Sequence, residues 1–283
     1  MGERTYYENR ELWDPRGGTD TFDRLRFDLV LSLLPDGVRT MLDAGCGNGR
    51  FLDHCRGRCE RAIGMDRSSA AIAVAKQTFR IPAIRGEVSR LPFRDGAFDA
   101  VVALEVLEHL PFSVYEGALS ELQRVARRAI VVNVPDAEKR LLVTCPYCGT
   151  RFHPAYHLRS FSRRSLEGLF DQFTLRRCER VRSDQVDFSR YPRLLKAYHA
   201  VVHPRLPGHV PIPAGARCPA CDYGAADDRA AARAGRRPPS GVRRRLLRLL
   251  PLRRYREAVA VYLRQGCGGP GPMTITNMDL IVK

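Results

Sequence analysis

The stretch VRTMLDAGCGNGRFLDHC, residues 38–55, constrains the fold of this chain more than any other part of the sequence. Residues 38–42 have the apolar character of a short buried strand, residues 43–49 form a glycine-rich turn, and a helix is expected from Arg50 onward. Small residues let a ligand approach the backbone of such a turn, and the start of the helix exposes free N–H groups. The stretch therefore predicts a ligand-binding edge. Its turn reads G-C-G-N-G and not G-x-G-x-x-G, which disfavours NAD.

The following segments alternate between strand and helix patterns. The strand RAIGMD ends in Asp66, and an acid at the end of a second strand can accept hydrogen bonds from two ribose hydroxyls. A buried strand over residues 98–103 ends at a polar cluster of Glu105, Glu108 and His109. Alternation of this kind, roughly every 25 residues, predicts an α/β fold with a doubly wound parallel sheet.

In this order and spacing, LDAGCGNGRFL, Asp66 and LPFRDGAFDAVVALEVLEHL resemble the class I S-adenosylmethionine-dependent methyltransferases, near the branch that methylates quinones and other small molecules. The resemblance covers residues 38–181. It implies a Rossmann-like, seven-stranded methyltransferase sheet with a zinc-stapled insertion, whose final strand NMDLIVK (277–283) returns antiparallel. The implied organisation is lid helices in 1–36, a core in 37–186 and 272–283, a zinc half-site insertion in 141–157, and a basic insertion in 187–271.

The resemblance also implies S-adenosylmethionine as the cofactor and a set of residues that bind it. Asp43 and the backbone of Gly45 and Gly47 would hold the methionine part, and Asp66 would hold the ribose. Glu87 matches an acid that contacts the adenine amine. The complete expected set is Asp43, Gly45, Cys46, Gly47, Asp66, Arg67, Glu87, Val88, Leu104 and Glu105. From the residues alone, Asp43 can instead cap the following helix, and Glu87 can be a solvated turn acid.

Two Cys-x-x-Cys pairs lie in the second half of the chain. Cys145 and Cys148 form the first pair, and Cys218 and Cys221 form the second. Two such pairs predict a closed tetrahedral zinc site, although the separation of the pairs is longer than in an ordinary zinc ribbon. Two thiol pairs with packing roles are the rival interpretation. His153 and His157 are alternative ligands in the region of the first pair.

Two further segments are candidates for the substrate side of the pocket. His157 opens HLRSFS, a segment that in related methyltransferases often faces the active site, and this resemblance makes His157 the first candidate for a general base. Near the N-terminus, Tyr6, Tyr7 and Trp13 have roughly helical spacing. They are expected either to cover the pocket as a lid, as in the family, or to form an ordinary docked helix.

The charge of the chain is concentrated in its second half. Residues 1–140 contain 21 Lys+Arg and 21 Asp+Glu, whereas residues 141–283 contain 26 and 10, so the whole excess of +16 lies in the latter. In the Arg-rich tract 242–256, arginines alternate with leucines. This pattern fits two short helices at an anionic membrane surface or a contact with an RNA backbone. It also fits a solvated helix that packs on the core. The excess charge thus predicts an acidic partner, with GC-rich coding as the alternative.

The N-terminus MGERTYYENR lacks an apolar signal region, and the chain has no apolar run of about 18 residues. A cytoplasmic protein is therefore expected, with a peripheral location at the membrane as a variant of this expectation. In the reducing cytoplasm its nine cysteines are not expected to form a disulfide framework. The expected function is methyl transfer to an oxygen, nitrogen or carbon nucleophile of a small-molecule or lipid-linked substrate. An RNA methyltransferase that grips RNA through the insertion and the Arg-rich tract, and a non-catalytic zinc-dependent binding module, are the alternatives.

Overall fold

The structure is a computed structural model that describes residues 6–14, 21–138, 140, 142–186, 216–224, 253–266 and 274–278. Its helical elements are η1 (Arg10–Trp13), α2 (Thr21–Leu33), α3 (Arg50–His54), α4 (Ser69–Gln77), η3 (Leu107–His109), α5 (Phe112–Val125) and α6 (Arg163–Glu167). Its strands are β1 (Thr40–Ala44), β2 (Arg61–Asp66), β3 (Ala83–Arg85), β4 (Phe98–Leu104), β5 (Ala126–Pro135), β6 (Val143–Thr144), β7 (Arg151–Phe152), β8 (Phe173–Val186), β9 (Arg253–Arg264) and β10 (Thr274–Met278).

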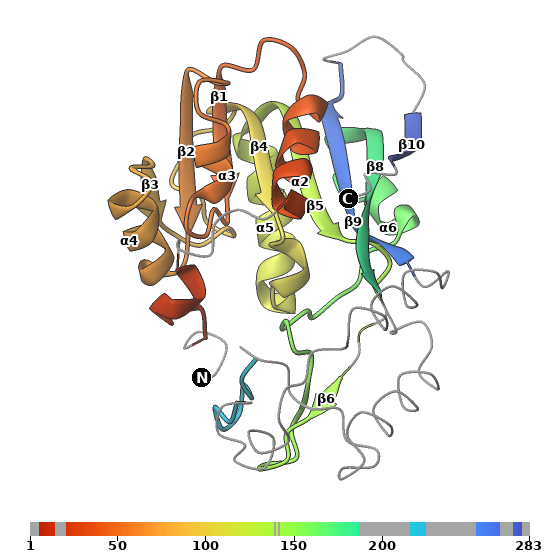
Figure 1. Ribbon diagram of the computed structural model, residues 1–283. Helices are drawn as coiled ribbons and strands as arrows, with labels where there is room; N and C mark the ends of the chain where they lie inside the picture. The colour runs from red at the N-terminus through yellow and green to blue at the C-terminus, as the bar shows by residue number, and fades with distance from the viewer. Residues whose placement is uncertain are drawn as a thin grey trace.

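The main sheet has the strand order β10-β8-β9-β5-β4-β1-β2-β3. Strands β3, β2, β1, β4 and β5 run parallel, and β9 is antiparallel to both β5 and β8. The predicted α/β fold with a seven-stranded, Rossmann-like mixed sheet is therefore confirmed, and β10 extends the sheet beyond β8 at one edge (Figure 1).

The expectation for the last strand was wrong. The antiparallel strand is β9, whereas β10 pairs parallel to β8 at the edge of the sheet. Strand β9 lies within the range 187–271 that was assigned to the basic insertion, so the core includes residues 253–264. It also replaces the helix expected after Pro251. Residues 258–262 are buried, and a strand covered on both faces has a continuous apolar pattern that is hard to distinguish from a buried helix.

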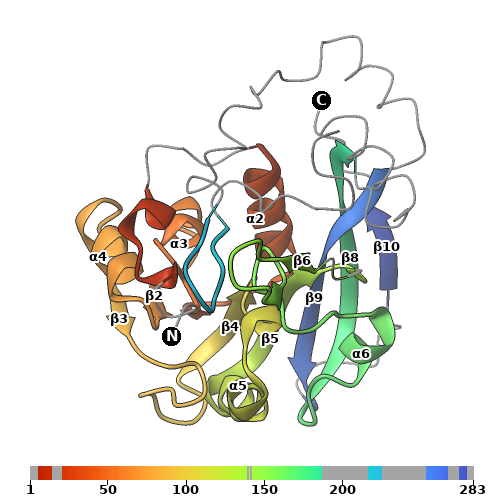
Figure 2. The ribbon, with the colours of Figure 1, turned by 90° about the horizontal axis from the view of Figure 1, so that it is seen from below.

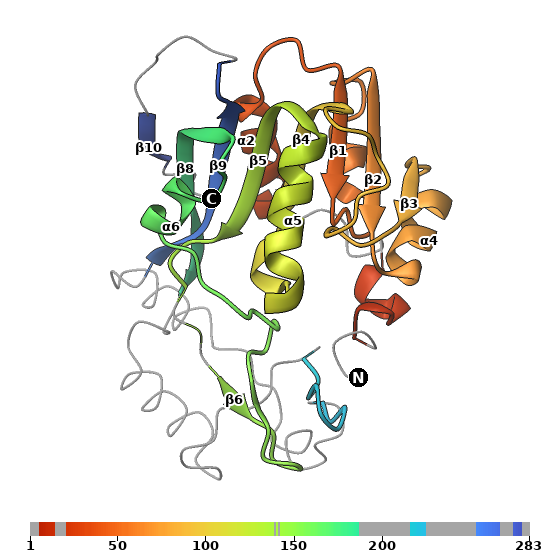
Figure 3. The ribbon, with the colours of Figure 1, turned by 180° about the vertical axis from the view of Figure 1, so that it is seen from behind.

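Helices cover both faces of the sheet. Helices α2, α3 and α4 pack on one face, where Phe27 and Phe51 meet at 5.3 Å between ring centroids. Helices α5 and α6 pack on the other face, and there Leu122 and Leu166 join the larger hydrophobic cluster. Figures 1 and 3 show these two layers from opposite sides. The sheet is therefore buried on both faces, and its carboxyl edge is left for ligands.

A small unit lies beyond that carboxyl edge. Strands β6 and β7 form a hairpin, and the segment 216–224 lies against it (Figure 2). The unit has its own apolar cluster, which contains Val143, Phe152 and Tyr156. Tyr6 of the N-terminal segment packs against this cluster, so the unit is joined to the part of the chain that was expected to act as a lid.

Among the helices of the described residues, none is long and apolar enough to cross a bilayer. The proposed membrane or RNA contact of the tract 242–256 falls almost entirely outside the described residues, which resume at Arg253 within β9.

The position of β9 in the centre of the sheet can be tested with Tyr262. Its side chain is fully buried, and its hydroxyl donates a hydrogen bond to the backbone carbonyl of Leu166 at 2.8 Å. We expect Tyr262→Phe to lower the free energy of unfolding by about 1 kcal/mol, because it removes a buried hydrogen bond. Tyr147→Phe is the matched control, since Tyr147 is 78% exposed. Equal urea midpoints for Tyr262→Phe and the wild type would argue against this packing.

Candidate functional site

A cavity of about 470 Å³ opens at the carboxyl edge of β1, β2 and β4. The ten residues expected to bind the cofactor all line it: Asp43, Gly45, Cys46, Gly47, Asp66, Arg67, Glu87, Val88, Leu104 and Glu105. They come from four separate strand ends and loops of the sequence. The structure thus brings the whole expected set together at one place, where a doubly wound sheet binds its ligands.

The glycine turn needs its glycines. Gly45 and Gly47 have φ angles of 92° and 51°, which favour glycine over residues with a side chain. A Cβ atom at Gly45 would collide with the side chain of Val106, and one at Gly47 would lie 2.8 Å from the ring of Trp13. The turn therefore combines a left-handed backbone with close approach of neighbouring groups.

Asp43 lies near the end of β1 and is only 2% exposed. Its Oδ1 has no hydrogen-bond partner among the described residues. Burial and the nearby charge of Asp66 raise the pKa of Asp43 to about 8, and Arg26 opposes this effect. An unsatisfied carboxylate oxygen in a cavity wall is suited to bind a cationic donor from a ligand. The alternative that Asp43 only caps the next helix has no support, because the N-cap of α3 is Gly49 with no side-chain cap.

Asp66 joins two loops at the cavity. Its carboxylate accepts hydrogen bonds from the backbone N–H of Gly47 at 2.9 Å and of Ser68 at 2.8 Å. The side chain of Ser68 in turn caps α4 by accepting from Ala71 N. The pKa of Asp66 is raised above its ordinary value, because the effect of burial exceeds the opposing effect of these backbone donors. A carboxylate has further lone pairs, so Asp66 can also accept hydrogen bonds from a ligand.

The other side of the cavity is apolar. Met65 and Val88 are buried residues of its lining.

Glu105 has an unusual backbone conformation at the end of β4. It directly follows Leu104, the last residue of the strand, and has a left-handed φ of 56°. Its backbone N–H donates to Asn133 O at 2.9 Å. A non-glycine residue in this conformation is uncommon and often marks a functional position.

The N-terminal segment covers the cavity. Tyr7 and Trp13 both line it, and Trp13 Nε1 donates to the backbone oxygen of Tyr7 at 2.7 Å. Ser68 Oγ donates to the same oxygen, and Asn48 Nδ2 donates to the backbone oxygen of Trp13. The carboxylate of Glu8 accepts from the first backbone N–H groups of α4. These bonds fix the segment over the glycine turn.

The structure separates His157 from the cavity. His157 is 9% exposed and is not among the lining residues; its Nδ1 lies 2.5 Å from Glu138 Oε2. The histidine that lines the cavity is His109, whose Nδ1 is 3.1 Å from the hydroxyl of Tyr7. Burial and the neighbouring His157 lower the pKa of His109 to about 3, so its ring is neutral. The sequence places His109 in the polar cluster that follows the strand over residues 98–103.

Sequence reasoning also missed Arg26. Its side chain is 12% exposed, lines the cavity, and forms ion pairs with Asp23 at 2.8 Å, Glu257 at 3.3 Å and Glu105 at 3.8 Å. The charges of these carboxylates raise the pKa of Arg26 and outweigh the opposing effect of burial. Arg26 and Glu257 are 231 positions apart in the sequence, so no local pattern could predict this ion pair.

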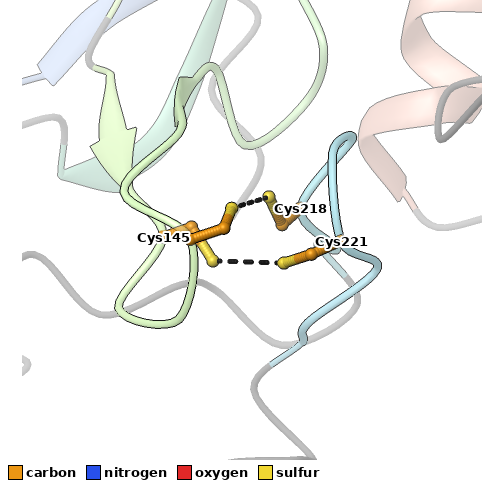
Figure 4. Close-up of side chains that lie close together, drawn as sticks. Cys145, Cys218 and Cys221 are labelled. Carbon is orange, nitrogen blue, oxygen red and sulfur yellow. Dashed lines mark hydrogen bonds between the residues drawn. The ribbon is translucent and has the colours of Figure 1, made fainter.

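The four cysteines of the two Cys-x-x-Cys pairs form one cluster (Figure 4). Both pairs have the same turn. The first cysteine of each accepts a hydrogen bond at its backbone oxygen from the residue four positions later, Gly149 or Asp222, and both of these residues have a left-handed φ. The backbone N–H of the first cysteine donates to the residue five positions later. Two unrelated thiol pairs would have no reason to share this geometry.

The sulfur positions fit a tetrahedral ion. Cys145 Sγ lies 3.6 Å from Cys221 Sγ, and Cys148 Sγ lies 3.5 Å from Cys218 Sγ. Metal–sulfur bonds of about 2.3 Å place the sulfurs of a tetrahedron about 3.8 Å apart. His153 and His157 cluster with Glu138 instead, apart from the four sulfurs.

Comparison with known proteins identifies the domain around the cavity. Residues 42–129 match the family model of a methyltransferase domain. A Xenopus tropicalis tRNA (carboxymethyluridine(34)-5-O)-methyltransferase alkbh8 is 36% identical over 98 residues, which are 34% of this chain and 14% of that protein. An Alkalilimnicola ehrlichii ubiquinone biosynthesis O-methyltransferase is 35% identical over 115 residues, which are 35% of this chain and 44% of that protein. The chain spans less than half the length of these curated relatives.

Two solved structures share the fold over most of the chain. A chain of the complex between the Haloferax volcanii Trm112 methyltransferase activator and a methyltransferase has a TM-score of 0.52 at 14% identity, and covers 92% of this chain and 96% of its own. The [4+2]-cyclase SpnF has a TM-score of 0.55 at 19% identity, with 93% and 94% coverage. The second structure is named for a cyclisation and not for methyl transfer, so this fold alone does not determine the reaction.

Asp43 provides a direct test of cofactor binding. We expect Asp43→Asn to weaken binding of S-adenosylhomocysteine by roughly 10- to 100-fold, because a hydrogen bond to a charged group is worth about 1.5–3 kcal/mol. The same change replaces a buried carboxyl that has an oxygen without a hydrogen-bond partner among the described residues, so the ligand-free variant should unfold at no lower temperature than the wild type. Isothermal titration and thermal melting measure the two effects. Asp53→Asn, on the exposed side of α3, is the control.

The raised pKa of Asp43 also predicts a pH dependence. Below pH of about 8 the free protein holds a proton on Asp43, which must leave when a cationic group binds. The Kd for S-adenosylhomocysteine should therefore rise as the pH falls from 8.5 to 6.5, with a limiting slope of about tenfold per pH unit. In Asp43→Asn this slope should be absent. A flat profile in the wild type would contradict the assignment.

Proposed function

We propose that this chain, whose residues 42–129 carry a class I S-adenosylmethionine-dependent methyltransferase domain, transfers a methyl group to a small-molecule or lipid-linked acceptor. The observation that supports this most strongly is the convergence of all ten expected cofactor residues on one cavity, with the unsatisfied carboxylate oxygen of Asp43 in its wall. Family match and cavity geometry thus point to the same residues.

The residues present fit the cofactor. Asp43 would bind its amino group, and the backbone of Gly45 and Gly47 would lie against the methionine part. Asp66 would accept hydrogen bonds from the ribose hydroxyls. The apolar wall around Val88 suits the adenine, with Glu87 beside it. Leu104 and Glu105 would close over the bound molecule. The guanidinium carbon of Arg67 lies 5.0 Å from the ring centroid of Tyr7, so Arg67 would connect the cofactor site to the N-terminal segment.

The contribution of the protein to the reaction is mainly orientation. When bound, S-adenosylmethionine supplies an electrophilic methyl group on a sulfonium. The side chains of Tyr7 and Trp13 cover the cavity and restrict water, and the fixed turn around Asp66 positions the ligand. His157 cannot contact an acceptor in the cavity directly, because His109 and not His157 lines the wall. The general base expected at His157 is therefore not supported by the geometry.

An oxygen acceptor is the first to test. The two curated relatives described above are named for methyl transfer to oxygen, although each shares only a part of its length with this chain. Because one of these relatives is named for a tRNA substrate, RNA is the alternative acceptor. Because a structure with this fold is named as a cyclase, a reaction other than methyl transfer is the second alternative. A membrane contact of the tract 242–256 and a cytoplasmic location remain predictions.

We also propose that the four-cysteine cluster holds a structural Zn²⁺ ion. The four sulfurs leave no ligand position open, as in structural zinc sites. The ion would join the β6–β7 hairpin to the segment 216–224. Tyr156 strengthens this join because its hydroxyl donates to the backbone oxygen of Arg217 at 2.5 Å, and its ring lies 4.6 Å from that of Tyr6. The zinc unit would thus support the N-terminal cover of the cavity.

A label-transfer experiment tests the proposed activity. Purified protein is incubated with methyl-tritiated S-adenosylmethionine and a host-cell extract, and the organic-soluble, small aqueous and nucleic-acid fractions are separated. We expect label in one of the first two fractions with the wild type, and at least tenfold less with Asp43→Asn. Label in RNA would replace the acceptor class. No transfer by a protein that binds S-adenosylhomocysteine would favour a non-methylating use of the fold.

Removal of one sulfur tests the zinc proposal. Cys218 is buried, so Cys218→Ser should release the ion and lower the melting temperature, because structural zinc contributes directly to folding free energy. Elemental analysis should show one zinc equivalent fewer than in the wild type. Cys59→Ser is the control, since Cys59 lies outside the cluster. Equal zinc contents in the two variants would refute the site.

A further inference from the structure

We propose that the four-cysteine unit, residues 142–157 and 216–224, carries a base-stacking platform for single-stranded RNA. The platform is formed by the rings of Tyr147 and Tyr223, with Arg151 on the same unit. It goes beyond the proposed function and does not depend on it, because neither tyrosine lines the cavity. Whether RNA bound there also receives a methyl group is a separate question, which the label-transfer experiment answers.

The two tyrosines come from different halves of the unit and lie parallel. Tyr147 stands between the cysteines of the first Cys-x-x-Cys pair, and Tyr223 follows the second pair. Their ring planes differ by only 3°, and their ring centroids are 6.4 Å apart. Parallel, offset rings form the start of a stack, which a further planar ring can extend.

Tyr147 is open to solvent. It is 78% exposed, whereas Tyr156 of the same unit is 5% exposed and belongs to the apolar cluster of the unit. A tyrosine that served only to pack the unit would be covered in the way that Tyr156 is. Tyrosine rings are enriched at binding surfaces, because they combine a large apolar face with a polar hydroxyl. Tyr147 therefore offers a ring face to another molecule.

The turns around the cysteines hold both rings in place. The backbone N–H of Gly149 donates to Cys145 O at 3.0 Å and closes the turn that contains Tyr147. The backbone N–H of Cys218 donates to Tyr223 O at 2.8 Å, and the side chain of Tyr223 packs against the apolar cluster of the unit. Rings that are fixed before binding lose little conformational freedom when a ligand stacks on them.

The unit that carries the rings is positively charged. Arg151, on β7, is exposed and has no ion-pair partner among the described residues. The sequence of the unit contains a single acid, Asp222, and this acid already accepts a hydrogen bond from Arg217 Nε at 2.8 Å. The charge of the unit therefore favours an anionic ligand.

The chain on either side of the second half-site is also basic. Residues 187–215 contain 4 Lys+Arg and 1 Asp+Glu, and residues 225–252 contain 8 and 2. Both ranges lie outside the described residues, so the sequence alone gives their excess of 12 − 3, or nine, positive charges. The segment that carries Tyr223 is thus bracketed in the sequence by chain that attracts phosphates.

Aromatic stacking and positive charge are together the two components of single-strand binding. A base of any type can stack on an aromatic ring, and cations near the ring attract the phosphates. Paired bases inside a duplex have no free face, so the platform requires the unpaired bases that RNA exposes in its loops, bulges and ends. An anionic membrane would also attract the charge, but it is bound through apolar helix faces, whereas parallel tyrosines match the planar face of a base.

Fluorescence anisotropy tests the platform. Full-length, zinc-loaded protein is titrated into a fluorescein-labelled, unstructured RNA of about 15 nucleotides at several salt concentrations. We expect Tyr147→Ala to weaken binding by roughly 5- to 100-fold, because one stacked base is lost. Tyr147→Phe keeps the ring and should bind within about twofold of the wild type. Arg151→Gln should lower the slope of log K against log salt by about 0.7.

A second exposed ring provides the matched control. Phe112 is 90% exposed but lies on α5, outside the unit, so Phe112→Ala should bind RNA like the wild type. Tyr147→Ala should keep the zinc content and the melting temperature of the wild type, which shows that it is folded. Its affinity for S-adenosylhomocysteine should also be unchanged, so this readout separates the platform from the proposed function.

Equal RNA affinities of Tyr147→Ala and the wild type would overturn the platform. Equal binding of a duplex of the same length would do so too, because it would leave only an effect of charge. Tighter binding of DNA with the same sequence would overturn the assignment to RNA. Affinity for phosphatidylcholine–phosphatidylglycerol vesicles that depends on Tyr147, with none for RNA, would assign the surface to a membrane. Loss of S-adenosylhomocysteine binding in the wild type would instead overturn the proposed function.

Discussion

The carboxylate of Asp66 is the interaction on which the cavity depends. It accepts backbone N–H groups from Gly47 and from Ser68, and so connects the glycine turn after β1 with the start of α4. Ser68 extends the connection, because its hydroxyl accepts from the first turn of α4 and donates to the backbone of Tyr7. One partly buried acid therefore fixes the floor of the site and, through Ser68, its cover. Side-chain to backbone bonds of this kind are short in range but hold loops that have no other regular pairing.

The N-terminal cover and the four-cysteine unit meet at an aromatic contact. Tyr6 and Tyr7 pack edge to face at 5.1 Å, and Tyr6 packs on Tyr156 of the cysteine unit. Tyr7 also reaches His109, at the cavity wall. The four-cysteine unit is thus connected to the cavity wall by a series of side-chain contacts that runs from Tyr156 through Tyr6 and Tyr7 to His109. The metal ion proposed at the four cysteines would therefore stiffen a cover that is too short to have a hydrophobic core of its own.

The sequence was sufficient for features that depend on local order along the chain. The parallel strands β1 to β5, the glycine turn and the acid at the end of β2 follow from periodicity and turn chemistry, and the fold is confirmed. The start of α6 also depends on local order, since Ser162 forms a capping box with Ser165 three residues later. Strand β9 was not predictable in this way. Its buried run has no period that separates a strand from a helix, and its partners lie more than 60 residues away.

In the candidate site, too, the residues that follow from local motifs were predicted, and those that depend on long-range packing were not. Every cofactor residue that was expected from a local motif lines the cavity, whereas Arg26 became visible only in three dimensions. His157 was placed near the active site on the basis of its segment, and the structure puts it one side chain further away, behind His109. A linear motif gives the order of residues at a sheet edge. It does not give which of two neighbouring rings faces the cavity, because that depends on the packing of a segment that arrives from elsewhere in the chain.

The buried acids around the cavity differ in whether the protein itself supplies a cation for them. Arg26 compensates Glu257, Asp23 and Glu105, so those carboxylates already have an internal cation. Asp43 and Glu108 are buried with carboxylate oxygens that have no hydrogen-bond partner among the described residues. Each such oxygen costs about 1–3 kcal/mol in the free protein, a cost that natural sequences accept at sites where a ligand relieves it. The amino group of the cofactor would relieve Asp43. The stability that the fold gives up at Asp43 in the absence of this ligand would then become part of the free energy of binding.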